Sequence, residues 1–505
     1  MEAQLLQTQP VHSHRTYGHF IDGSLSDASV TLIDRHSPAD GRLLARFSAG
    51  TSQDVDAAVA AALKAFNREN WRDLSGSARA GLLNKLADLI ADNADYLVRL
   101  EAEESAKATK MSVYELAMVV EMTRFAASLA VTEKGETHTQ LGPLSLGLVT
   151  KEPCGVVGMI VPWNFPLICL FQKLPYALAA GCTVVIKPSE LTSSTALEIA
   201  RLASTAGFPQ GVINVVTGTG TAVGEALTSH PDVSLISFTG STGVGRHIAG
   251  KCGEAVKRVA LELGGKGANI VFADADLDAA LDGVLFGFVF NQGEVCAAGS
   301  RLLIEESVAD AFVSKLAERA KRIVVGHPMD KNADMSALIH EGHMNKVLGY
   351  VADGQKEGAI LTCGGERLQG QAYDNGFFVG PTILTEVTSS MRVFREEIFG
   401  PVLCVTKFKT QEEAIHLANS TDFGLANGVW SKDIDKIFTV ARQLKSGTVF
   451  ANTFLEAAPQ LPQGGVKKSG FGRENGLDAL NEYLDTKQTY VKLGARQPIL
   501  AHTIS

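Results

Sequence analysis

The chain has 505 residues, which is too long for a single hydrophobic core, so two or three domains are expected. A formal net charge of −9 argues against nucleic acid or an anionic membrane as the main partner. The seven cysteines are widely spaced with no Cys-x-x-Cys pair, and no His-Glu-x-x-His motif occurs. We therefore expect no disulfide framework, no metal site and a reducing, cytoplasmic location.

No export or membrane segment is expected. Residues 1–13 have no basic region followed by the apolar run that a secretory signal requires. The uncharged stretch 153–172 resembles a membrane span, but Pro162, Asn164 and Pro166 interrupt the helix that a span needs.

The first 130 residues favour short strands followed by a layer of helices. Strands are predicted at 29–33 and 43–47, and Thr51 or Ser52 is expected to cap a helix that runs to Phe66. Further helices are predicted at 77–93, 95–107 and 112–130. The strand-prone segment 131–152 is either a hairpin that leaves the domain or an ordinary surface loop.

From Gly155 onward, apolar strands and helices alternate regularly. Strands are predicted at 156–161, 183–186, 212–215, 233–238 and 258–261, with helical patterns at 166–180, 194–206, 222–228 and 244–252. This alternation predicts an open, Rossmann-like parallel sheet of the α/β class with helices on both faces.

Polar or glycine-rich groups follow all five of these strands. Parallel strands end on one edge of a sheet, and ligands bind there. A single glycine at a strand–helix turn is usually only a turn, but five such ends together predict a ligand edge. The ends are Pro162 to Pro166, Lys187 to Glu190, Thr217 to Gly220 with Gly224, Thr239 to Gly245, and Glu262 to Lys266.

The second half predicts another α/β domain, with mixed strand and helix patterns from 269 to 452. They lie at 269–272, 277–290, 302–304, 308–324, 343–357, 377–384, 402–408, 411–419, 428–430, 434–444 and 448–452. The last segment, 483–493, alternates and predicts an edge strand suited to pairing with another chain.

Three side chains could supply nucleophilic chemistry. Cys296 has small neighbours that leave its thiol reachable, although most cysteines simply pack in a core. A thiol nucleophile needs an oxyanion donor and a base, and Asn164 and Glu262 lie at strand ends. Burial between Leu261 and Leu263 is expected to raise the pKa of Glu262 toward general-base range, although it could be a structural acid instead. Spacing alone does not place the three in one site.

Two features at the predicted ligand edge fit a dinucleotide. The turn from Gly240 to Gly245 could hold a pyrophosphate at a helix N-terminus. Glu190, after the second strand, could hold the adenosine ribose, or could be a solvated acid at a helix start. Glu190 would repel a 2′-phosphate and favour NAD over NADP, and Lys187 would soften that preference.

Six motifs, in this order, resemble those of the NAD(P)-dependent aldehyde dehydrogenase superfamily, in its hydrolytic branch that does not acylate CoA. The resemblance covers roughly residues 20–495. The motifs are Pro162-Trp163-Asn164-Phe165-Pro166, Phe238-Thr239-Gly240-Ser241, Leu261-Glu262-Leu263-Gly264-Gly265-Lys266, Asn291-Gln292-Gly293-Glu294-Val295-Cys296, Glu396-Glu397-Ile398-Phe399-Gly400-Pro401 and Ser469-Gly470-Phe471-Gly472-Arg473-Glu474.

The resemblance implies a role for each matching residue. Cys296 would attack the aldehyde, Asn164 and the Cys296 N–H would hold the oxyanion of the thiohemiacetal, and Glu262 would activate the water that hydrolyses the thioester. Glu397 would hold the nicotinamide ribose and Phe399 would support the ring. The implied NAD site, with NADP possible, comprises Ile160, Pro162, Trp163, Lys187, Ser189, Glu190, Gly220, Gly224, Phe238, Gly240, Ser241, Val244, Leu263, Glu397 and Phe399.

The resemblance also implies an organisation into domains and an oligomer. Residues 1–130 with 153–264 would bind NAD, 265–478 would form the catalytic domain, and 131–152 with 479–505 would be oligomerisation strands. A homodimer or homotetramer is implied.

Departures from the family pattern bear on the substrate. Relatives often have an aromatic residue where this chain has Gln463, and relatives with bulky hydrophobic substrates often have one where it has Gln172. Glu456 also replaces part of an aromatic run. We therefore expect a wider, more polar tunnel for a polar or broad range of aldehydes. The predicted pocket residues are Phe165, Gln172, Val295, Ala297, Glu456 and Gln463.

Two alternatives stay open at this point. A CoA-acylating semialdehyde dehydrogenase would pass the thioester to a thiol and would not need Glu262. A non-catalytic binding or structural protein could keep the fold, although Cys296, Asn164 and Glu262 are all present.

Overall fold

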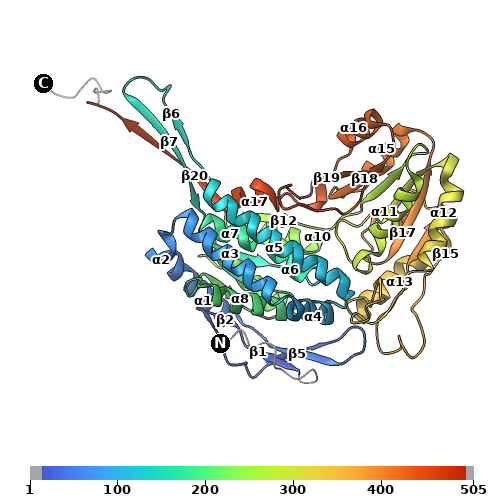
Figure 1. The fold of residues 1–505 in the computed structure, drawn as a ribbon, viewed down its shortest axis with the longest axis horizontal. Helices are drawn as coiled ribbons and strands as arrows, with labels where there is room; N and C mark the ends of the chain where they lie inside the picture. Colours follow the sequence, from blue (N-terminus) through green and yellow to red (C-terminus); the bar gives the residue numbers. More distant parts are fainter. Residues whose placement is uncertain (1–13, 496–505) are drawn as a thin grey trace.

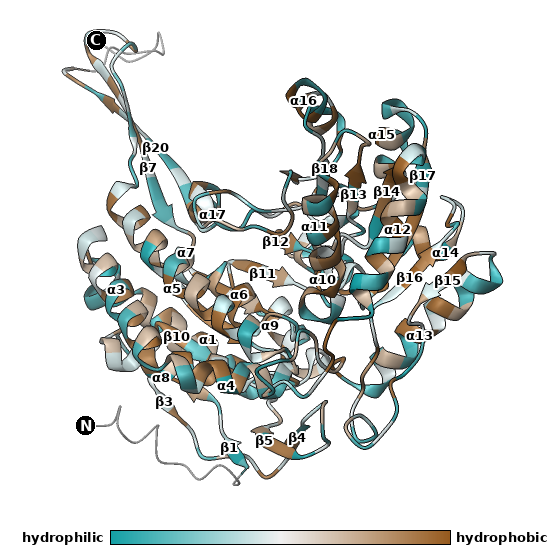
Figure 2. Cartoon of the chain, turned by 45° about the vertical axis from the view of Figure 1, so that its right-hand side comes forward, coloured by the Kyte–Doolittle hydropathy of each residue, from teal (hydrophilic) through white to brown (hydrophobic). Residues whose placement is uncertain are grey.

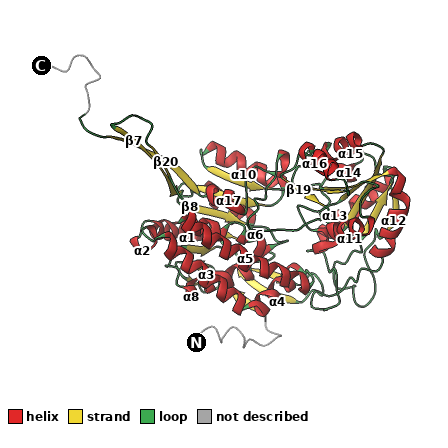
Figure 3. Cartoon of the chain, turned by 45° about the horizontal axis from the view of Figure 1, so that its top comes forward, coloured by secondary structure: helices red, strands yellow, loops and turns green. Residues whose placement is uncertain are grey.

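The computed structural model describes residues 14–495. Residues 1–13, for which no export signal is expected, and residues 496–505 of the predicted oligomerisation segment lie outside the described residues. Two seven-stranded sheets carry most of the fold, and two three-stranded sheets accompany them. Helices lie outside the strands of both large sheets (Figure 3). No helix of the described part is long and apolar enough to cross a membrane.

The first large sheet contains the five strands expected to be parallel. Its order is β12-β11-β8-β9-β10-β2-β3, and the first five of these strands run parallel. The prediction of a parallel sheet is therefore confirmed. Two strands from the N-terminal arm extend it in antiparallel fashion beside β10. The strands are β8 (Val156–Ile160), β9 (Thr183–Lys187), β10 (Ile213–Val215), β11 (Leu235–Thr239), β12 (Arg258–Glu262), β2 (Phe20–Ile21) and β3 (Ser24–Leu25).

Alternation along each strand creates a core on both faces of this sheet. In β8, Val157 and Met159 join one hydrophobic cluster, and Val156 and Ile160 join the opposite one. One face is covered by α3 (Gly76–Asp92), α4 (Ala94–Ser105), α5 (Thr109–Thr132), α6 (Pro166–Phe171), α7 (Leu174–Ala180) and α8 (Ser194–Ala206). The other is covered by α1 (Ser52–Phe66), α9 (Glu225–Ser229) and α10 (Thr242–Glu254).

The prediction of a single helix at 166–180 is wrong in one respect, because the chain forms two helices there, α6 and α7. Lys173 has φ −120° and ψ −59°, outside the helical region, and Pro175 lies in the first turn of α7. Proline has no N–H to donate to the carbonyl four residues earlier, so a continuous helix would lose a hydrogen bond there. The break leaves the side chains of Gln172 and Lys173 buried in the interior.

The second large sheet is built from residues 268–451. Its order is β15-β16-β17-β14-β13-β18-β19, with only the β15–β16 pair antiparallel. Its strands are β13 (Ala268–Val271), β14 (Arg301–Glu305), β15 (Ile360–Cys363), β16 (Thr382–Thr385), β17 (Val402–Phe408), β18 (Ala426–Trp430) and β19 (Thr448–Ala451). The predicted second α/β unit is present. Figure 2 shows that β11 of the first sheet and β13 of the second sheet are both hydrophobic.

Helices cover both faces of the second sheet as well. One face packs against α11 (Leu277–Val289) and α12 (Glu306–Ala320). The other packs against α13 (Glu341–Lys356), α14 (Arg392–Arg395), α15 (Gln411–Asn419) and α16 (Ile434–Gln443).

Segment 131–152 is a hairpin rather than a surface loop. It forms β6 (Glu136–His138) and β7 (Ser145–Pro153), and β7 pairs along its whole length with β20 (Leu484–Lys492). These three strands form an arm that projects from the body, at the upper left of Figure 1. The helix α17 (Gly476–Glu482), which packs against α7 and leads into β20, was not predicted.

The remaining strands lie near the N-terminus. The strand predicted at 29–33 lies three residues later, as β4 (Leu32–His36). It belongs to a sheet of order β1-β5-β4. The other elements here are β1 (Arg15–Tyr17), β5 (Leu43–Ser48) and α2 (Glu69–Arg72).

Candidate functional site

Cys296 lies between η3 (Phe290–Gly293) and β14, three residues after a tight left-handed turn within η3. Asn291, Gln292 and Gly293 have φ values of 47°, 56° and 69°. Only glycine fits at 293, because a Cβ there would lie 2.2 Å from the Gly400 carbonyl oxygen. The turn is thus held against the second sheet, and the Cys296 thiol stays partly exposed.

The Cys296 thiol is protonated at rest. Burial raises its pKa to about 12, and the nearby Glu397 and Glu262 carboxylates raise it further. The loop after Glu262 touches the cysteine directly, because a Cβ on Gly265 would lie 2.2 Å from the Cys296 carbonyl oxygen. Close approach of the two backbones therefore depends on a glycine at 265.

Asn164 lies beyond the end of β8 and is buried against the cysteine turn. Its Nδ2 donates a hydrogen bond of 2.7 Å to the Glu294 carbonyl, two residues before Cys296. The Asn164 backbone carbonyl accepts a hydrogen bond of 3.0 Å from Asn291 Nδ2. An amide nitrogen carries two hydrogens, so the bond to Glu294 uses only one of them.

Glu262 ends β12 with its side chain buried. Burial raises its pKa to about 8, although the Lys173 and Arg473 charges oppose the rise. Its Oε1 is buried and has no hydrogen-bond partner among the described residues. A buried carboxyl with a free oxygen and a pKa near neutrality has the properties of a general base.

Two charged residues beside Glu262 received no role from the sequence. The Lys173 ammonium forms a buried ion pair with the Glu474 carboxylate, which also accepts a bond of 3.3 Å from Thr239 Oγ1. Burial lowers the pKa of Lys173 to about 8. Glu474 closes the last of the six motifs, so its position was visible in the sequence but its partner was not.

The strand ends meet as predicted at one edge of the first sheet. After β9, Lys187 Nζ lies 3.1 Å from Glu190 Oε2, and the Glu190 side chain is partly exposed. Ser189 between them is buried, and its Oγ accepts a weak bond from the Leu191 N–H. Ile160, which ends β8, is buried, and Pro162 follows it with partial exposure.

Open space lies beside the short helix η2 (Gly220–Gly224), which leads into α9 at this edge. A Cβ on Gly220 or Gly224 would meet nothing within 4 Å. At the start of α10, Ser241 Oγ accepts the Val244 N–H at 3.4 Å. Phe238 lies beneath Gly240, where a Cβ would be 2.5 Å from the ring.

The other end of the edge is aromatic. The Phe399 ring, whose residue has φ 62°, packs edge-on against Trp163 with centroids 5.5 Å apart. His343 packs against both rings and hydrogen-bonds the Phe399 carbonyl at 2.6 Å. Burial lowers the His343 pKa to about 4, so the imidazole is neutral. Sequence reasoning missed His343, because no motif marked it.

Glu397 and Leu263 complete the set of predicted cofactor residues. Glu397 Oε1 accepts the Gly265 N–H at 3.0 Å, and burial raises the Glu397 pKa to about 7. Leu263 packs against α10 at Gly245, where a Cβ would be 2.3 Å from its side chain. These residues fit a dinucleotide: open glycines and a helix N-terminus suit the pyrophosphate, and Glu190 and Glu397 suit the two riboses.

A cavity of about 370 Å³ leads to Cys296. All six predicted pocket residues line it, namely Phe165, Gln172, Val295, Ala297, Glu456 and Gln463. Gln172 Nε2 donates a bond of 3.0 Å to Gln463 Oε1 across the cavity wall. Glu456 is exposed and accepts a bond of 2.7 Å from Thr453 Oγ1. Most other lining side chains are apolar, so polarity is confined to a few points.

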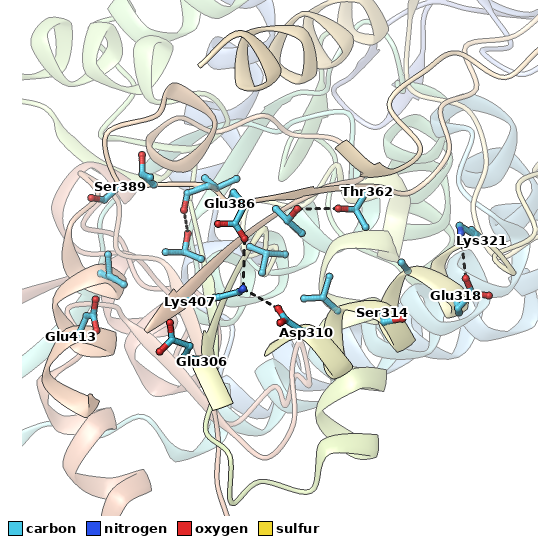
Figure 4. A pocket seen from close by; sticks show the side chains of 18 residues that line it. Glu306, Asp310, Ser314, Glu318, Lys321, Thr362, Glu386, Ser389, Lys407 and Glu413 are labelled. Carbon is cyan, nitrogen blue, oxygen red and sulfur yellow. Dashed lines mark hydrogen bonds and ion pairs between the residues drawn. The ribbon is translucent and has the colours of Figure 1, made fainter. Parts of the chain in front are cut away.

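A second cavity, of about 750 Å³, shares no lining residue with the first. It lies along α12 and β17, where Lys407 bridges Asp310 and Glu386 (Figure 4). Its other lining carboxylates include Glu306, Glu318 and Glu413. Across residues 14–495, no cluster of His, Cys, Asp and Glu side chains has the arrangement to hold a metal ion.

The chain resembles known proteins over nearly its whole length. The model of the "Aldehyde dehydrogenase family" matches residues 25–489. Aldehyde dehydrogenase family 2 member C4 of Arabidopsis thaliana is 43% identical, covering 94% of both chains. Betaine aldehyde dehydrogenase of Bacillus subtilis is also 43% identical, covering 93% of this chain and 96% of the other.

Solved structures agree with these relatives. The NAD-dependent aldehyde dehydrogenase of Sinorhizobium meliloti superposes with a TM-score of 0.95 at 42% identity, covering 97% of each chain. Betaine aldehyde dehydrogenase of Staphylococcus aureus in complex with NAD+ superposes with a TM-score of 0.94 at 38% identity, covering 100% of this chain and 98% of the other.

Proposed function

The chain belongs to the aldehyde dehydrogenase family, and from that premise we propose that Cys296, Asn164 and Glu262 carry its reaction. The enzyme oxidises an aldehyde to a carboxylic acid with NAD. One observation supports these roles above all: the Asn164 amide and the backbone after Glu262 both contact the turn that holds Cys296.

In the acylation half, the Cys296 thiol loses its proton to solvent, and the sulfur attacks the aldehyde carbon to form the oxyanion of a thiohemiacetal. Asn164 Nδ2 and the Cys296 N–H donate to the resulting oxyanion, and one such donor contributes about 3 kcal/mol to transition-state stabilisation. NAD, when bound, supplies the hydride acceptor for the oxidation. A thioester on Cys296 is left.

In the hydrolytic half, the Glu262 carboxylate takes a proton from water, and the water oxygen attacks the thioester carbon. The carbon–sulfur bond breaks, which restores the Cys296 thiol and releases the acid. The free Oε1 of Glu262 supports this role, because no protein donor competes with the water. A CoA-acylating enzyme would have no use for such a base.

Two variants test these assignments. Cys296→Ala is expected to abolish turnover while NAD binding, measured by calorimetry, is retained. Glu262→Gln is expected to give a burst of one NADH per site and then slow turnover, because only hydrolysis is impaired. Dehydrogenase activity in Cys296→Ala, or normal steady-state turnover in Glu262→Gln, would refute them. CoA added to wild type tests the acylating alternative, which predicts an acyl-CoA product.

We propose NAD as the preferred cofactor over NADP. The Glu190 carboxylate at the end of β9 would repel a 2′-phosphate, and the Lys187 ammonium 3.1 Å away reduces that repulsion. Comparing kcat/KM for the two cofactors in wild type and Glu190→Gln tests this. The preference for NAD is expected to fall in the variant, and an unchanged ratio would contradict the proposal.

We propose a polar aldehyde as the substrate. The Gln172–Gln463 bond leaves Gln172 Oε1 and Gln463 Nε2 without a hydrogen-bond partner among residues 14–495. The cavity therefore offers a substrate one acceptor and one donor. Glu456 adds a negative charge, which favours neutral or cationic substrates over anionic ones. The betaine aldehyde dehydrogenases among the relatives are consistent with this class.

A substrate panel tests this proposal. Hydroxy- and ω-amino-aldehydes are expected to exceed long alkyl aldehydes in kcat/KM. Gln463→Leu is expected to narrow that difference, whereas Ala457→Ser, on the same cavity wall, serves as a control that keeps both amides. Highest efficiency with long alkyl aldehydes in wild type would exclude a polar specificity.

We propose a homodimer or homotetramer that uses the arm, and a domain division of 1–130 with 153–264, 265–478, and 131–152 with 479–505. The arm strands β6 and β20 are free edges, and Tyr490 and Leu144 on the arm are more than half exposed. Analytical ultracentrifugation tests the oligomer, and a monomer at micromolar concentration would contradict it. Seven free cysteines support a cytoplasmic location.

A further inference from the structure

Two cysteines outside the active site lie in contact at the base of the arm. Cys154 Sγ is 3.7 Å from Cys182 Sγ. Cys154 connects β7 to β8, and Cys182 connects α7 to β9. Both thiols are free, and no hydrogen bond joins any two of the other five cysteines within residues 14–495.

The pair holds the residue that leads into β20. The Tyr483 carbonyl accepts the Cys154 N–H at 3.0 Å and the Cys182 thiol at 3.4 Å. Arg258 lies beside it and donates to the Leu484 carbonyl. The two sulfurs therefore lie next to the start of the β7–β20 pair. In Figure 1 this pair projects from the body of the protein as the arm.

The two thiols differ in exposure, and this difference decides which of them a peroxide can reach first. Cys154 is partly exposed, and Cys182 is fully buried behind it. Burial raises the pKa of Cys182, but donation from the Cys154 thiol and from nearby backbone amides outweighs burial and leaves this pKa lowered. The pKa of Cys154 is raised, because its thiol hydrogen-bonds to Cys182 and is largely buried, and the positive charge of Arg258 only opposes this rise.

We propose that Cys154 and Cys182 form a reversible disulfide when the protein meets a peroxide. The Cys154 sulfur, having lost its proton to solvent, attacks one peroxide oxygen, which gives a sulfenic acid and, with that proton, one water. The Cys182 thiolate then attacks the Cys154 sulfur. The sulfur–sulfur bond forms, and hydroxide leaves with the Cys182 proton as a second water. Two thiols are oxidised and one peroxide is reduced.

The geometry allows this reaction with little movement. The sulfurs must approach from 3.7 Å to about 2.05 Å, and both cysteines lie within two residues of the starts of neighbouring parallel strands, β8 and β9. The bridged segment, 154–182, also carries Asn164 and Gln172. Oxidation thus fixes both ends of the segment that contributes to the proposed active site.

Peptide mapping of the full-length protein tests the disulfide. Cys296→Ser serves as the background, so that the catalytic thiol does not consume the hydrogen peroxide. We expect a peptide linking Cys154 to Cys182, a loss of two free thiols, and recovery of both with dithiothreitol. Cys363→Ser, which removes another partly exposed thiol, is expected to keep the cross-link.

Cys182→Ser is expected to lose the cross-link and to accumulate sulfinic acid at Cys154. If that variant does not fold, Cys154→Ser replaces it, because a partly exposed position tolerates substitution better. In Cys154→Ser, peroxide is expected to cause no loss of two free thiols. Sulfinic acid at Cys154 without any cross-link in the Cys296→Ser background would overturn the proposal. A link from Cys154 to any other cysteine would overturn it equally.

Discussion

Replacing Glu262 with glutamine is expected to stabilise the fold while it removes the proposed base. Burial raises the pKa of Glu262 from 4.5 to about 8. Between these values folding takes up a proton, so the buried carboxyl lowers the free energy of unfolding as pH rises, by about 1.4 kcal/mol per pH unit. The loss is absent below pH 4.5 and constant above pH 8. At pH 7 it amounts to about 3 kcal/mol, which glutamine avoids because it cannot ionise.

Urea unfolding of wild type and Glu262→Gln at two pH values measures this difference. The variant is expected to be more stable by about 2 kcal/mol at pH 6 and by about 4 kcal/mol at pH 8. Glu318→Gln, at a side chain that is 63% exposed, is the matched control and is expected to match wild type at both. A difference that does not grow with pH, or a variant less stable than wild type, would refute the reasoning.

Three further outcomes are expected. Hydrolysis of the thioester, followed in single turnovers, should rise about tenfold from pH 7 to pH 9 as Glu262 with a pKa of about 8 ionises, and a flat profile would contradict its role. Asn164→Ala should lower kcat about 10²–10³-fold and also lower Tm, because it removes the buried bond to the Glu294 carbonyl, and an unaffected kcat would exclude Asn164 as an oxyanion donor. Gly265→Ala adds a Cβ 2.2 Å from the Cys296 carbonyl and should cost about 100-fold in kcat/KM. A Cβ on Gly253 would meet nothing within 4 Å, so Gly253→Ala should leave kcat/KM nearly unchanged. Equal steady-state rates for the two glycine variants would be evidence against the contact between Gly265 and Cys296.

The sequence by itself determined the local structure and the classes of group at the sheet edge. The helix predicted at 194–206 has the bounds of α8, and α1 begins at Ser52 after a Thr51 N–H bond to Asp54. Both features depend only on residues close together in the chain. Hydrophobic periodicity sets which face of a helix is buried, and a capping side chain marks the residue at which the helix begins. The same locality made the five strand ends recognisable as one ligand edge.

Only the tertiary structure decided which of these groups meet. Gln172 and Gln463 are 291 residues apart, and their bond across the cavity wall exists because the broken helix turns Gln172 inward. The approach of Gly265 to Cys296 likewise follows from packing between two sheets. A periodic pattern records which face of an element is apolar but not which other element covers it. The partners of the site residues therefore became visible only once the two cores had been placed side by side.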